Sequence, residues 1–179
     1  MSELKSPKYW IALPVILLLY VFLKASGQHT TMLMLRLIML AVGYTAALTD
    51  LREKRVPNKL VLGLAAAWLL VLAPLALTDP QAAMTIGIRG LLGAVAAAVV
   101  MLFVYVVSRR GLGGGDVKLM CVMGLYLGID GTLTALLYGS VMAALTSLVL
   151  VLMKKLTAKD AIPLVPFLYA GMVIAEYIR

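Results

Sequence analysis

Seven apolar runs divide the 179-residue chain, and they constrain its fold more than any other feature. The runs lie at residues 9–24, 31–50, 58–78, 86–108, 117–129, 131–153 and 162–178. About 20 apolar residues make a membrane-spanning helix. Lipid admits only helices and closed barrels, because every backbone polar group there needs an internal partner. Since the runs lack the alternation of barrel strands, the sequence predicts an all-α polytopic membrane protein with about seven transmembrane helices.

Composition excludes the other broad classes of protein. Hydrophobic residues make up 63% of the chain and charged residues only 13%, which is too little polar surface for a water-soluble domain. The one cysteine, Cys121, excludes an internal disulfide and a zinc site built from cysteines. We expect no metal and no cofactor. The run at 117–129 covers only about 20 Å as a helix, so its helix should be tilted or begin below the membrane surface.

The basic residues predict the topology. The net charge of +8 comes from small groups of Lys and Arg between the apolar runs, which is typical of anchors to an anionic membrane surface and not of nucleic-acid binding. A cytoplasmic amino terminus places twelve of the sixteen on the cytoplasmic side: Lys5, Lys8, Arg52, Lys54, Arg55, Lys59, Arg109, Arg110, Lys118, Lys154, Lys155 and Lys159. The carboxyl terminus then faces out. The first run also has the outline of a cleavable signal peptide, but Lys24 stands where a small residue is needed.

Two carboxylates stand out by position. Asp50 closes the run at 31–50, and Asp116 opens the run at 117–129. Two complete spans lie between them, so both return to the cytoplasmic face, where they can meet. Two adjacent carboxylates share one proton, so one can act as general base toward a water while the other polarises a carbonyl or protonates the departing amine. This is the chemistry of an aspartic protease, with a coupled titration of the pair.

Glycines and prolines lie next to these candidates. Gly113, Gly114 and Gly115 precede Asp116 and allow the backbone of an extended substrate to come close. They also free a helix start, where N–H groups favour a carboxylate or a developing oxyanion. Pro163 and Pro166 should shape the last helix near the cytoplasmic face and form a wall of the substrate groove.

Each feature has a simpler interpretation. Asp116 can be the N-cap of its helix, and Asp50 can pair with Arg52 or Arg55 in a solvated loop. A small ion- or proton-coupled transporter would use the same carboxylates. The glycine loop argues against transport because it lies at the surface and not at the midplane. A catalytically inactive membrane scaffold is a third alternative.

Three ordered segments resemble the type IV prepilin peptidase family of membrane aspartic proteases. They are residues 50–58 (DLREKRVPN), 111–119 (GLGGGDVKL) and 163–171 (PLVPFLYAG), and Gly113 to Asp116 form a Gly-x-Gly-Asp motif. The resemblance implies that Asp50 and Asp116 are catalytic and that the enzyme removes the short basic leader of prepilins or pseudopilins at the cytoplasmic face of the inner membrane. It also implies a six-helix core.

The resemblance therefore divides the chain into residues 1–30, a cytoplasmic tail with an extra helix, and residues 31–179, the peptidase domain. The chain lacks the cytoplasmic insertion with paired Cys-x-x-Cys motifs found in the methylating members. It is similar to the short, peptidase-only forms. Implied partners are the prepilin leader with its amino-terminal helix and the lipid bilayer, with assembly into a homo-oligomer left open.

Overall fold

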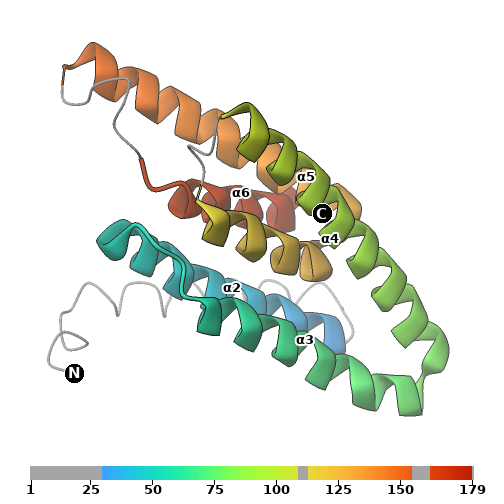
Figure 1. Cartoon of the computed structure of the whole chain (residues 1–179). Helices are drawn as coiled ribbons and strands as arrows, with labels where there is room; N and C mark the ends of the chain where they lie inside the picture. The colour runs from blue at the N-terminus through green and yellow to red at the C-terminus, as the bar shows by residue number, and fades with distance from the viewer. Residues whose placement is uncertain (1–29, 109–112, 155–161, 179) are drawn as a thin grey trace, which may run out of the picture.

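The computed structural model describes residues 30–108, 113–154 and 162–178, which form five α-helices and no strand (Figure 1). The helices are α2 (Thr30–Glu53), α3 (Asn58–Thr78), α4 (Pro80–Val107), α5 (Gly114–Leu152) and α6 (Val165–Ile178). Helices α2 to α5 are long and apolar enough to cross a membrane, whereas α6 is a shorter apolar helix. The all-α membrane class is confirmed. The helix predicted at residues 9–24 lies outside the described residues.

Local signals set the helix boundaries. Asp79 caps α4, because its Oδ1 accepts a hydrogen bond from the Ala82 N–H at 3.0 Å. Pro80 follows at the first helical position, where a missing N–H costs nothing. These polar and proline residues start α4 six residues before the predicted run at 86–108, because a helix can extend beyond its apolar part when its first turn is capped.

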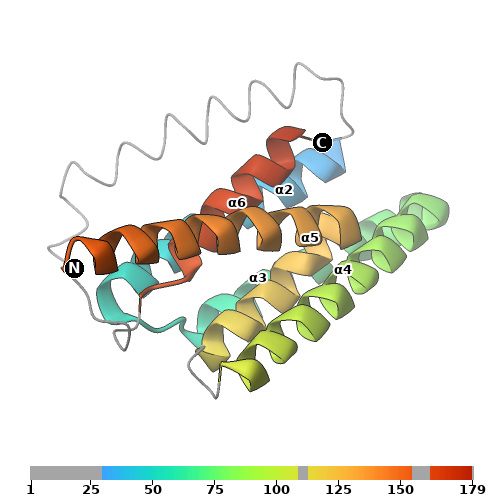
Figure 2. The ribbon, with the colours of Figure 1, turned by 90° about the horizontal axis from the view of Figure 1, so that it is seen from above.

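Helix α5 consists of two helical segments that meet at Gly128. The runs at 117–129 and 131–153 were predicted to form two separate helices, and the break at Gly128 divides α5 between them. Gly128 has φ 64° and ψ −176°, a backbone conformation that residues with a Cβ rarely adopt. In Figure 2 the first half of α5 runs beside α4, and the second half changes direction and passes over α6. The bend therefore lets one element pack against two neighbours.

Small residues bring the backbones of these helices together. A Cβ added at Gly93 of α4 would collide with the carbonyl oxygen of Gly124 in α5. A Cβ added at Gly171 of α6 would likewise collide with the carbonyl oxygen of Ala135. In lipid, where apolar side chains gain little from leaving their surroundings, such close backbone packing is a main source of helix association. Helices α4 and α6 are therefore packed closely on α5, and the three helices form a unit.

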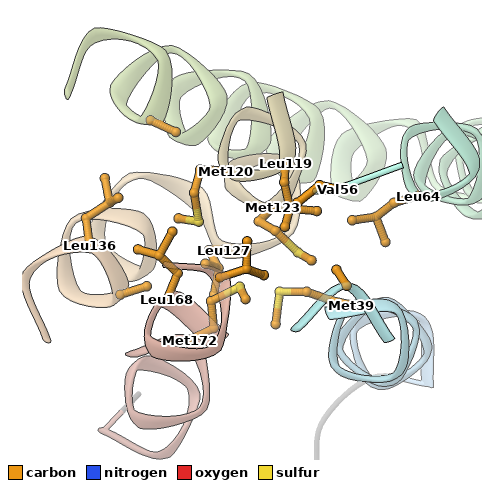
Figure 3. Close-up of a cluster of buried hydrophobic side chains, with 14 of the residues drawn as sticks. Met39, Val56, Leu64, Leu119, Met120, Met123, Leu127, Leu136, Leu168 and Met172 are labelled. Carbon is orange, nitrogen blue, oxygen red and sulfur yellow. The ribbon is translucent and has the colours of Figure 1, made fainter. Parts of the chain in front are cut away.

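The core lies where the five described helices converge, and it is rich in methionine (Figure 3). Its largest fully buried side chains are Met39, Leu40, Leu64, Leu119, Met120, Met123, Leu127, Leu168 and Met172. Unbranched, flexible methionine side chains fill the irregular space between helices that cross at different angles. Several methionines of the chain therefore serve packing.

Candidate active site

Asp50 is held by the start of α6. It lies near the end of α2, and only 4% of its surface is exposed. The backbone N–H of Val165 donates a hydrogen bond to its Oδ2 at 3.1 Å. The first N–H groups of a helix have no partner within the helix and carry the positive end of its dipole, so they suit a buried carboxylate. The expectation that Asp50 pairs with a basic neighbour in a solvated loop is wrong, because the residue is buried.

Two prolines flank the Val165 donor. Residues 162–164 are not helical, and the Leu164 carbonyl accepts hydrogen bonds from the N–H groups of Phe167 and Leu168, both at 3.1 Å. Pro166 is the second residue of α6, where no N–H is needed within the helix. Pro163 and Pro166 are both half-buried at this helix entry. Their shaping of the entry is observed, and their contact with substrate stays a prediction.

Asp116 lies in the first turn of α5 and is half-buried. The N-cap position belongs to Gly113, whose carbonyl accepts a hydrogen bond from the Asp116 N–H at 3.1 Å. The Asp116 carboxylate in turn accepts a backbone hydrogen bond from Gly113. This is the return half of a capping box, in which the third helical residue reaches back to the N-cap. The interpretation of Asp116 as the N-cap itself is therefore wrong, although its side chain does help to fix the helix start.

The three glycines before Asp116 have different surroundings. Gly113 and Gly114 are exposed, and a Cβ at Gly114 would meet nothing within 4 Å. A Cβ at Gly115 would lie 3.2 Å from the Cβ of Val56 and 3.3 Å from its carbonyl oxygen. Val56 is buried in the short connection between α2 and α3. Gly115 therefore allows this connection to pack on the start of α5, and Gly113 and Gly114 are the two left open toward solvent.

The structure brings the two aspartates together. The carboxyl groups of Asp50 and Asp116 lie close enough for their charges to interact, although the two residues lie on different helices. The three elements that meet here are the end of α2, the start of α5 and the start of α6. The arrangement supplies two interacting carboxyl groups, each with a backbone donor: Val165 for Asp50 and Gly113 for Asp116. It can position a water between an acid and a base.

A side-chain contact joins the starts of α3 and α5 beside this pair. The ammonium group of Lys118 donates a hydrogen bond to Oδ1 of Asn58 at 3.5 Å. Lys118 lies two residues after Asp116, and Asn58 follows Pro57, which stands at the N-cap position of α3. Both side chains are exposed. The contact, together with Val56 under Gly115, fixes the start of α5 against the connection that leaves α2.

Sequence reasoning did not assign a site role to Val165, Val56 or Asn58. Val165 acts through its backbone N–H, which every residue except proline has, so its identity carries no signal. Only the two prolines around it indicated a constrained helix entry. Among residues 30–108, 113–154 and 162–178, no group of three or more His, Cys, Asp or Glu side chains could hold a metal ion. Residues 109–112, which include Gly111, lie outside the described part of the chain.

Comparisons with known proteins agree with the motifs. The family model described as the type IV leader peptidase family matches residues 37–148, an interval that contains both Asp50 and Asp116. The prepilin leader peptidase/N-methyltransferase of Bacillus subtilis (strain 168) is 30% identical over 129 residues, which cover 72% of this chain and 49% of that protein. The chain thus spans about half the length of this curated relative. No solved structure matches the chain significantly. By the extent of the family match, the chain belongs to the type IV leader peptidase family.

Proposed function

We propose that this protein is a membrane aspartic endopeptidase that removes the short basic leader from prepilins or prepilin-like proteins. The observation that carries the proposal is the meeting of Asp50 and Asp116, two carboxyl groups whose charges interact across helices α2 and α5. Membership of the leader peptidase family supports the substrate class. Family membership also favours a peptidase over an ion-coupled transporter. No contact among the described residues supports a transporter.

The proposed mechanism needs only these two side chains and a water. The Val165 N–H engages Oδ2 of Asp50, so the other oxygen of this carboxyl group is left for the water. One ionised aspartate takes a proton from the water as it attacks the scissile carbonyl carbon, and the partner aspartate gives its proton to the carbonyl oxygen. As the tetrahedral intermediate collapses, the aspartate that took the water's proton gives it to the departing amine, and the partner aspartate takes a hydroxyl proton back from the intermediate as the carbonyl re-forms. The pair ends with one shared proton, as it began.

The substrate is proposed to lie extended along the open part of the glycine loop. Gly113 and Gly114 are exposed and precede Asp116, and Pro163 and Pro166 stand on either side of the Val165 donor. A peptide bond must leave its helix to be attacked, because its carbonyl is otherwise occupied and screened by side chains. Backbone approach along glycines would present such an extended segment to both aspartates. Gly115 serves the packing of Val56 in this arrangement.

The site is proposed to face the cytoplasm in a chain that crosses the inner membrane several times, with seven helices counted from residue 9. Exposed basic side chains gather near the site end of the described helices: Arg52, Arg55, Lys59 and Lys118. The excess of Lys and Arg on cytoplasmic loops supports this orientation. Residues 1–30 would form the tail and an additional helix, and residues 31–179 the peptidase domain.

The test is cleavage of a prepilin that carries its leader, by purified protein in detergent or lipid nanodiscs. Asp50→Asn and Asp116→Asn should each reduce leader removal at least a thousandfold, because neither amide can exchange a proton in the required way. Asp130→Asn is the matched control, since Asp130 is an exposed aspartate in the same helix as Asp116. Wild-type rates in either single variant would show that the aspartate pair is not the catalytic group.

A further inference from the structure

One face of α2 packs against α6 and carries an ionisable residue near each end. Arg36, Gly43 and Asp50 are spaced seven residues apart, about two helical turns, so they share this face. Gly43 lies against the ring of Tyr169, and Asp50 accepts the hydrogen bond from Val165. Arg36 therefore lies on the same face of α2 as Gly43 and Asp50, and this face includes part of the candidate active site.

Arg36 forms a buried ion pair with Glu176 of α6. Its Nε lies 2.9 Å from Oε2 of Glu176, and the two side chains are 16% and 2% exposed. Ionisable side chains buried between membrane helices are rare, and they are kept where they pair and serve a function. Along α2 this pair is about 21 Å from Asp50, so it touches neither the aspartates nor a substrate bound to them.

The contacts between these two ends are made by apolar groups, which do not by themselves fix the position of α6 along α2. Leu40, Gly43 and Ala47 occupy the α2 face, and Tyr169 and Met172 lie on α6. Lipid tails are as apolar as these side chains, so burial alone gives little preference for one sliding position of α6 over another. A slip by one turn, about 5.4 Å, would replace one apolar contact by another. It would, however, leave Arg36 and Glu176 opposite apolar groups.

We propose that Arg36 and Glu176 are positioning residues, whose ion pair fixes the register of α6 on α2. That register places the Val165 N–H against Oδ2 of Asp50. The pair thus acts on the candidate catalytic carboxylate through the length of α6, and it touches no reacting atom. The inference deepens the proposed function, on which its kinetic test rests, but the register itself can be measured independently.

The kinetic experiment compares Arg36→Met, the apolar double variant Arg36→Met with Glu176→Leu, and Arg89→Met in the full chain. The double variant removes both charges together, so it leaves no unpaired buried charge and keeps the helices packed. Arg89 is an exposed arginine of α4 and is the matched control. For leader cleavage per folded molecule, we expect kcat of the double variant to fall at least tenfold with KM within twofold, and Arg89→Met to equal the wild type. A purely structural role would lower the folded fraction and leave kcat unchanged.

Cysteine cross-linking measures the register of α6 on α2 independently of activity. In a Cys121→Ser background, cysteines at positions 43 and 169 report the observed register, and cysteines at 43 and 173 report a slip by one turn. Removing the ion pair should lower the 43–169 yield at least threefold and raise the 43–173 yield. Unchanged yields together with wild-type kcat in the double variant would overturn the proposal. If the wild type cleaves no prepilin, the proposed function fails, and the cross-linking yields still decide the register.

Discussion

Replacing Gly115 by alanine should slow the proposed cleavage by displacing Asp116. The new Cβ would lie 3.2 Å from the Cβ of Val56 and 3.3 Å from its carbonyl oxygen, whereas carbon atoms prefer separations of about 3.5–4.0 Å. The start of α5 must therefore move away from Val56 by roughly 0.5 Å. Asp116 is the next residue, so its carboxyl group moves as well.

The magnitude follows from two opposing effects. Overpacking a well-filled site costs about 1–3 kcal/mol. Alanine is preferred to glycine in a helix by about 0.5–1 kcal/mol. The net free energy of unfolding should thus fall by up to about 2.5 kcal/mol. Misplacing a catalytic group by about 1 Å can cost a hundredfold in rate, so a shift of about half that size should lower kcat about tenfold.

Gly114→Ala is the matched control for this change. It adds the same methyl group one residue earlier, where nothing lies within 4 Å, so stability and kcat should be retained. If the substrate backbone lies along the loop as proposed, KM should rise. The assay is steady-state leader cleavage together with thermal unfolding in the same detergent. A Gly115→Ala protein with wild-type stability and kcat, or equal destabilisation by both substitutions, would refute the packing argument.

Two further predictions concern α5 and its contacts. Lys118→Met should lower cleavage about tenfold by releasing the start of α5 from Asn58, while Lys59→Met, an exposed neighbour, should have no effect. Equal rates for both variants would exclude a role for the contact. Gly128→Ala should destabilise the protein by about 1–3 kcal/mol, because φ 64° is unfavourable for alanine. Gly63→Ala, on an open helix surface, should raise the thermal unfolding temperature instead, and a fall would contradict this.

The helical membrane class and the convergence of Asp50 with Asp116 were predictable from sequence. Apolar runs reveal membrane helices because lipid penalises every alternative, and an even number of spans returns two residues to one face. The division of α5 was predicted between the runs at 117–129 and 131–153, but not the residue at which it falls, since glycine also occurs inside helices of this chain. The sequence also could not predict that Glu176 pairs with Arg36 and not with Arg89, because the two arginines lie at similar depth in their helices.

The order in which the site residues are synthesised determines when the site can first form. Asp50 enters the bilayer with α2, but its backbone donor belongs to residue 165, which is synthesised 115 residues later. During that interval the carboxylate lacks this partner. In the proposed peptidase, proteolytic competence therefore arises only after α6 has been synthesised and packed against α2.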